Sequence, residues 1–239
     1  MYSTAHIGTP TAFSGQVAWA DRLELYKGGR RVDSQSLKKS KIPRAFKLAD
    51  HNLRQELGNS NYTILGFADG KQVIKTHRFI RTIPSFEDYF TVEKNESFDW
   101  DFEFSKGAVL FNDGSEAEKG WVVEDDGLKI AQINNGNYSA MVDTAVSFFL
   151  NLPAKTSTNL RIQGSYDTEV DCDILFVTLD VGKNKTELIK FSGNGTIDEV
   201  IQLPRFSQPT RAELSFRFIS DPLVEGPGVT IEQIRIEAN

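Results

Sequence analysis

The fold class of this chain follows from the stretch Leu214-Ser215-Phe216-Arg217-Phe218, in which apolar and polar side chains alternate. Successive side chains of a β-strand point to opposite faces of a sheet, so this stretch predicts a strand that buries one face. The same period of two runs from Phe98 to Ser105, where four aromatic residues alternate with acidic or polar ones. We expect strands in both places, with Trp100 packed in the core beside the neighbouring rings.

Further runs with strand character follow one another at short intervals. They are Ala108–Phe111, Trp121–Val123, Leu128–Ile133, Ala145–Leu152, Leu160–Tyr166, Asp173–Val181, Thr186–Phe191, Glu199–Leu203, Ala212–Ser220 and Gly228–Ile236. Turn signals between them are Asp113-Gly114, Asp126-Gly127, Asn135-Gly136 and Asn194-Gly195. Because no helical stretch of about 10 to 15 residues separates the strands, the pattern predicts an antiparallel sandwich.

The last run breaks the alternation once. Its apolar phase slips between Ile231 and Ile234. A strand can keep such residues on one face only by inserting an extra residue, so we expect a β-bulge near Glu232 and Gln233.

The first 83 residues contain shorter extended segments joined by tight turns. Gly28-Gly29 and Asp69-Gly70 each lie between two extended runs and predict β-hairpins, because these residue pairs accept positive φ angles. Between the hairpins, Ala49, Leu53 and Leu57 fall at i, i+4 and i+8 before a glycine, which indicates one short helix.

A boundary between two domains is predicted at Pro84. Proline cannot donate to a β-ladder and restricts the residue before it, and aromatic residues become denser after this point. Seventeen phenylalanines against two methionines also favour sheets. We therefore expect an all-β chain, with a small β-sandwich over residues 1–83 and an antiparallel, jelly-roll-like β-sandwich over residues 84–239.

The charge of the chain argues against two classes of partner. The net charge is -6, whereas nucleic acids and anionic lipid surfaces attract basic proteins. No apolar run reaches the length of about 18 residues that membrane insertion needs. The segment Met1-Tyr2-Ser3-Thr4 does not resemble the start of a signal peptide, so we expect either a cytoplasmic protein or the mature part of an exported one.

Sequence motifs for nucleophilic catalysis and for histidine-bound metals are missing. The three histidines lie far apart, and none belongs to a His-Glu-x-x-His pattern. The single cysteine, Cys172, excludes an internal disulfide. It lies between Asp171 and Asp173, whose carboxylates would raise the pKa of the thiol, so we expect a packed or half-buried thiol rather than a nucleophile.

The carboxylates of the aromatic strand allow two interpretations. Asp99, Asp101 and Glu103 share one face of the predicted strand. We interpret this face as solvated, although paired acids also serve glycoside hydrolysis and calcium binding.

Aromatic side chains raise the question of ligand binding, since flat rings stack on sugars. Trp19, Trp100 and Trp121 could each do so. Trp121 follows a glycine near predicted turns, and Tyr138 lies in a predicted loop. We therefore select Trp121 and Tyr138 as the candidate ligand-binding residues.

Several short motifs are spread over the second domain. They are Ser85-Phe86-Glu87-Asp88, Gly120-Trp121, Asp173–Val177, Ile201-Gln202-Leu203, Leu214–Asp221 and Gly228–Ile234. Together they resemble the MAM-like jelly-roll domains of secreted bacterial proteins, which accompany peptidases such as immune inhibitor A and occur in the adhesin regions of gingipains. The first domain resembles a fibronectin type III unit in Leu23–Arg30 and Asn61–Phe67.

The jelly-roll resemblance implies a structural calcium ion between an early carboxylate and one near the last strand. On this chain the corresponding residues are Glu87 and Glu232, with Asp173 as a further ligand. The usual Ile-Asp-Asp ending is here Ile231-Glu232-Gln233, which keeps one carboxylate.

Two functional hypotheses follow. The first is a non-catalytic extracellular or cell-surface recognition or accessory module that binds a glycan or a protein, with loops carrying the contact. The alternative is a hydrolase, either the C-terminal part of a secreted peptidase or a sandwich-fold enzyme that cleaves glycans. The glycan-cleaving enzyme would need two carboxylates about 5 to 9.5 Å apart across a cleft.

Overall fold

The computed structural model describes residues 3–52, 57–100, 102, 108–112, 120–124, 127–131 and 136–239. Within these ranges the chain consists of β-strands, loops and one 3₁₀ turn, η1 (Phe86–Asp88), which confirms the all-β prediction. No helix in these ranges is long and apolar enough to cross a membrane. The chain divides into two compact units, Met1–Ser85 and Phe86–Asn239, close to the boundary predicted at Pro84.

The first unit is a small β-sandwich. Its strands are β1 (Ser3–His6), β2 (Thr11–Val17), β3 (Arg22–Lys27), β4 (Arg30–Ser36), β5 (Arg44–Asp50), β6 (Gly58–Ala68) and β7 (Lys71–Ile83). One sheet has the order β1-β7-β6-β3-β4, and β2 pairs with β5 in a second one. Apolar side chains of both sheets, among them Phe13, Leu25, Leu48 and Tyr62, form one buried cluster.

Both predicted hairpins of the first unit are confirmed. Gly28 and Gly29 join β3 to β4 with φ angles of 52° and 78°. Asp69 and Gly70 join β6 to β7 with φ angles of 50° and 78°. Positive φ at both central positions matches the right-handed twist of the flanking strands.

The helix predicted from Ala49 is wrong at its start. Ala49 lies in β5 and pairs with Ala12 of β2, and its backbone amide donates to the carboxylate of Asp33 at 2.8 Å. Pairing with a neighbouring strand therefore overrides the local spacing of apolar residues. Leu53 lies outside the described residues.

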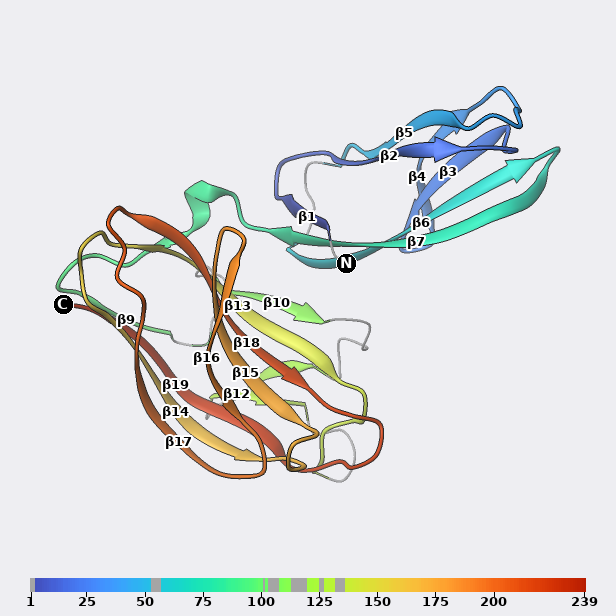
Figure 1. Cartoon of the computed structure of the whole chain (residues 1–239). Coiled ribbons are helices and arrows are strands. Elements are labelled where there is room, and N and C mark those ends of the chain that lie inside the picture. The colour runs from blue at the N-terminus through green and yellow to red at the C-terminus, as the bar shows by residue number, and fades with distance from the viewer. Residues whose placement is uncertain are drawn as a thin grey trace. The chain divides into compact units, whose positions relative to one another are not determined.

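The second unit contains two larger sheets. Its strands are β8 (Phe90–Thr91), β9 (Ser97–Asp99), β10 (Ala108–Asn112), β11 (Trp121–Glu124), β12 (Gly127–Ile130), β13 (Asp143–Leu152), β14 (Thr158–Asp167), β15 (Ile174–Val181), β16 (Asn184–Phe191), β17 (Asn194–Gln202), β18 (Thr210–Ile219) and β19 (Gly228–Ala238). One sheet has the order β10-β13-β18-β15-β16, with β8 on β13, and the other has β11-β12-β19-β14-β17, with β9 on β19. Figure 1 shows β14, β17 and β19 running side by side.

The core of the second unit lies between these two sheets. Inward-facing residues of β13 and β18, such as Phe148 and Phe216, share one cluster with Ile162 of β14 and Ile234 of β19. Alternation along β18 is as predicted, because Leu214, Phe216 and Phe218 belong to this cluster.

The aromatic stretch after Phe98 is only partly a strand. Strand β9 ends at Asp99, and Trp100 is buried as predicted, with 3% exposure. Phe102 packs against the core but has a φ of 60°, so the strand does not continue through it. Asp101, Glu103 and Phe104 lie outside the described residues.

The predicted bulge is confirmed at Glu232. Gln163 of β14 pairs with Gln233, whereas Gly164 pairs with Ile231, so Glu232 is the extra residue of β19. A Cβ on Gly164 would lie 2.1 Å from the carbonyl oxygen of Thr230, and one on Gly127 would lie 2.3 Å from that of Ile231. Glycines on both neighbouring strands therefore make room for the bulge.

One predicted turn is shifted. Asn194-Gly195 begins strand β17, and the turn lies just before it, where Gly193 has a φ of 89°. Gly193 satisfies the positive φ that the turn requires, so the next two residues are free to join the ladder. The turns predicted at Asp113-Gly114, at Asp126 and at Asn135 lie outside the described residues.

Candidate functional site

The predicted calcium ligands are not brought together. Asp173 is fully buried, and its two carboxylate oxygens accept hydrogen bonds from the backbone amide of Asp221 at 2.7 Å and from the hydroxyl of Tyr138. Glu87 and Glu232 are exposed, on η1 and on the bulge of β19. Asp173 therefore fixes loops, and the predicted set Glu87, Asp173 and Glu232 is corrected.

The predicted ligand-binding rings are buried. Trp121 and Tyr138 are 2% and 0% exposed. Tyr138 packs edge-on against Phe218, with 5.1 Å between ring centroids, and burial followed by the hydrogen bond to Asp173 raises its pKa above the ordinary value. Neither ring offers a face to a sugar, so this prediction is corrected. A glycine or loop context in the sequence does not show what packs on the ring.

A small cluster of acidic and thiol groups lies beside Asp173. Ligand atoms of Glu169, Cys172 and Asp221 lie within 4.8 Å of one another, and this is the one such group among the residues that the structure describes. Cys172 is exposed, so the prediction of a packed or half-buried thiol is wrong. Loss of water around the group, and then the charges of Asp221 and Asp173, raise the pKa of Glu169.

The cluster offers few metal ligands. Desolvation of the sulfur, and then the negative charges of Glu169, Asp221, Asp173 and Asp171, raise the pKa of Cys172, as the sequence predicts. Without a metal the thiol keeps its proton at neutral pH, and a metal would have to displace that proton to bind the sulfur. The carboxylates of Glu169 and Asp221 remain, against the six to eight oxygens, approximately, that calcium takes.

The raised pKa makes Cys172 a slow nucleophile. We expect its alkylation by iodoacetamide to reach half of the maximal rate above about pH 8.5, the value of an unperturbed thiol. Glu169→Gln removes a negative charge and should move this midpoint to lower pH, whereas Glu187→Gln, on the distant strand β16, should not. Mass spectrometry of the alkylated protein across neutral and alkaline pH measures both shifts. Equal midpoints in all three proteins would show that the charge of Glu169 does not act on the thiol.

A groove on the outer face of the second unit has the chemistry of a binding site. Its volume is about 510 Å³, and its lining residues are Thr91, Asn151, Gln208, Pro209, Thr210 and Arg211. Asn151 pairs with Thr91 of β8 on one side and with Arg211 of β18 on the other, so three polar residues form one row across three strands. Their neighbours Leu150 and Ala212 lie in the core, so the row faces outward.

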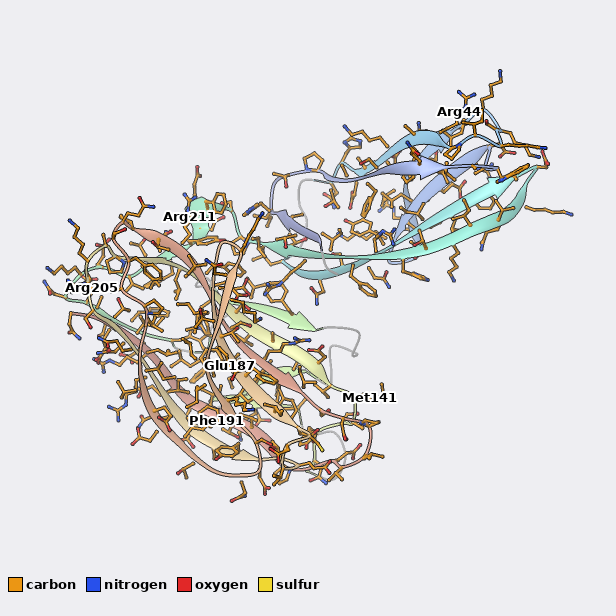
Figure 2. The ribbon with its side chains drawn as sticks, in the orientation of Figure 1. Arg44, Met141, Glu187, Phe191, Arg205 and Arg211 are labelled. Carbon is orange, nitrogen blue, oxygen red and sulfur yellow. The ribbon has the colours of Figure 1, made fainter. Side chains whose placement is uncertain are left out.

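An aromatic border lies next to this groove, called here the outer-face groove. The guanidinium of Arg211 stacks 4.1 Å above the ring of Phe86, and Figure 2 shows Arg211 beside η1. Phe86 is 46% exposed and meets Tyr89 with 5.6 Å between centroids. The stacked guanidinium keeps its hydrogen-bond donors available at the edge of a flat apolar ring.

Some polar side chains of the lining are hydrogen-bonded to neighbouring residues, and others are not. The side-chain amide of Asn151 donates to the carbonyl of Tyr89 and to the hydroxyl of Thr91, both at 3.3 Å. The side chains of Gln208 and Arg211 make no hydrogen bond with the described residues. Fixed and free donors side by side suit the recognition of hydroxyl groups, which donate and accept.

The sequence contains one signal for this groove. Strand β13 is buried almost throughout, and Asn151 is a polar interruption near its end. A polar residue in such a run needs either a partner or a function. Thr91 and Arg211 carried no comparable signal, because only the register brings them to Asn151.

Trp19 of the first unit is another exposed aromatic group. It is 53% exposed, with a φ of 68°, and the ammonium of Lys41 lies 5.5 Å from its ring centroid. Of the three tryptophans, the sequence favoured Trp121 for stacking, whereas the structure leaves Trp19 open and buries Trp100 and Trp121.

Comparisons with known proteins give no family. Neither a protein-family model nor a curated protein matches the sequence. Distant structural likenesses include tripeptidyl peptidase 2 (8% identity, TM-score 0.47, covering 99% of this chain and 19% of that one). A second is the secreted serine protease VesC from Vibrio cholerae, with 10% identity, a TM-score of 0.38 and coverage of 99% of this chain and 48% of that one. A third is a β-glucuronidase from Bacteroides uniformis, with 11% identity, a TM-score of 0.27 and coverage of 100% of this chain and 29% of that one. This chain thus spans less than half of each of these chains, and likenesses at this level carry no conclusion about activity or ligand.

Proposed function

We propose that this chain is a non-catalytic carbohydrate-binding accessory module of a secreted or cell-surface protein, and that it holds a glycan in the outer-face groove. The row Thr91, Asn151 and Arg211, bordered by the exposed ring of Phe86, is the observation that carries the proposal. Amides, hydroxyls and a guanidinium bind sugar hydroxyls, and an aromatic ring covers the C–H face of a sugar.

The charge and the volume of the groove also favour a neutral or weakly acidic glycan. Its lining carries one charge, that of Arg211, while the remaining polar groups are neutral. Its volume of about 510 Å³ lies within the range of about 300 to 1,000 Å³ typical of small-ligand sites. The resemblance of the sequence to jelly-roll domains that accompany secreted peptidases supports an accessory role outside the cell.

A glycan array followed by calorimetry tests the proposal. We expect at least one oligosaccharide to bind, and we expect Arg211→Ala to weaken that binding by about tenfold, which corresponds to the loss of one charge-assisted hydrogen bond. Arg161→Ala removes the same side chain from β14 of the opposite sheet, where it pairs with Asp198, and should leave the affinity unchanged.

Two outcomes would overturn this proposal. Either no glycan binds, or Arg211→Ala and Arg161→Ala bind as well as the unchanged protein. Chromatography of the bound oligosaccharide after prolonged incubation separates binding from catalysis, since cleavage products would favour the hydrolase instead.

A further inference from the structure

The first unit contains a pocket whose charge is opposite to that of the whole chain. The pocket has a volume of about 500 Å³ and is lined by Lys27, Arg30, Arg31, Val32, Asp50, His51 and Asn52. Three cationic side chains thus face one carboxylate, in a protein with a net charge of -6.

The cations of this pocket are crowded by the strand register. Lys27 and Arg30 form the last cross-strand pair of the β3–β4 hairpin, directly before and after the Gly28-Gly29 turn. Like charges that face each other across a ladder repel and destabilise the pair. An anion between them would remove this repulsion.

The carboxylates near the pocket are already occupied. Asp50 is 3% exposed and accepts hydrogen bonds from the hydroxyl of Tyr62 at 2.8 Å and from the backbone amide of Asn52 at 3.0 Å. The ammonium of Lys27 lies 3.9 Å from the same carboxylate. These contacts hold the carboxylate of Asp50 in place at the pocket.

Glu24, behind the hairpin, is occupied too. It is 4% exposed, and its carboxylate lies 3.1 Å from Arg31 and 3.2 Å from Arg22. The hydroxyl of Tyr26 also donates to it at 2.7 Å. Glu24 thus positions Arg31 and does not reach a second pocket cation in any of these contacts.

Arg30 and His51 are left without a partner among the described residues. Arg30 is exposed at the hairpin end, and His51 follows the buried Asp50 at the end of β5. A guanidinium offers a planar fork of donors that fits a carboxylate or a sulfate with two hydrogen bonds.

We propose that this pocket binds an anionic group of an acidic glycan, with Arg30 as the principal contact and Lys27 and His51 beside it. The site lies in the other unit from the outer-face groove and does not depend on it. Carboxylate and sulfate groups share the required chemistry, so uronic-acid chains and sulfated chains are the two sources to distinguish.

The experiment measures binding of polygalacturonate and of dextran sulfate to the full chain by calorimetry at low and at moderate salt. We expect binding of at least one polyanion, weakened as salt rises because charges are screened. Arg30→Glu should weaken it by more than tenfold, since an attractive contact becomes repulsive. Arg44→Glu changes the same charge at the start of β5, outside the pocket, and serves as the matched control (Figure 2).

The two variants distinguish binding at this pocket from a general effect of charge. Loss of binding in Arg30→Glu but not in Arg44→Glu supports the site, and the polyanion that binds identifies its source. Binding of neither polyanion, or an equal loss in both variants, overturns it. Arg211→Ala should leave polyanion binding intact, so failure of the outer-face groove would not be mistaken for failure of this pocket.

Discussion

Gly164→Ala is expected to lower the free energy of unfolding of the second unit by about 3–5 kcal/mol. The added Cβ would lie 2.1 Å from the carbonyl oxygen of Thr230 and 3.0 Å from the Cα of Ile231. Both are backbone atoms of the bulged strand β19, which can move away only by breaking the ladder with β14. The cost is therefore that of a distorted sheet at the centre of the unit.

Urea unfolding measures this cost. In a Trp19→Phe background the remaining tryptophans, Trp100 and Trp121, both lie in the second unit, so their fluorescence reports that unit alone. Gly182→Ala is the control, since Gly182 has a φ of 62° but nothing within 4 Å of an added Cβ. It should cost about 1 kcal/mol. Equal costs for the two variants would contradict the close approach at the bulge.

Asp173→Ala is expected to destabilise the second unit by about 3 kcal/mol or more. The substitution leaves two donors without this acceptor, namely the buried hydroxyl of Tyr138 and the partly buried backbone amide of Asp221. Tyr138→Phe keeps the ring in the core and removes only the hydroxyl, so it should cost less, about 1–2 kcal/mol. Asp173 would thus be the residue that ties these loops together.

The matched control is Asp221→Ala. It removes a neighbouring carboxylate but keeps the backbone amide that donates to Asp173, so it should cost well under half as much in the same urea experiment. If Asp221→Ala were as destabilising as Asp173→Ala, general charge effects rather than the buried hydrogen bonds would explain the loss.

Local patterns predicted much of the fold because their physical cause is local. The bulge at Glu232 follows from the phase slip between Ile231 and Ile234, since both side chains must reach the same core. The Gly28-Gly29 hairpin follows from the φ angles that its turn requires. Where pairing with a distant strand competes with a local pattern, as at Ala49, the local pattern fails.

The candidate sites could not be predicted in the same way. Tyr138 lies in a loop context, but its hydroxyl is satisfied by Asp173, 35 positions away, which buries the ring. The outer-face groove exists only because the register places Thr91 and Arg211 on either side of Asn151. The alternation within one strand does not determine its register with distant strands. Composition and spacing therefore predict the strands but not the sites that their pairing creates.

The most direct test of the proposed function is a ¹H–¹⁵N NMR titration with the oligosaccharide that binds in the array. Asn151 and Gln208 line the outer-face groove, and the NMR signals of their side-chain amides can be followed individually. The groove predicts that these two signals, with the backbone signals of Thr91 and Arg211, shift first and saturate together. Shifts confined to other residues, such as those around the exposed Trp19, with Asn151 and Gln208 unchanged, would contradict it.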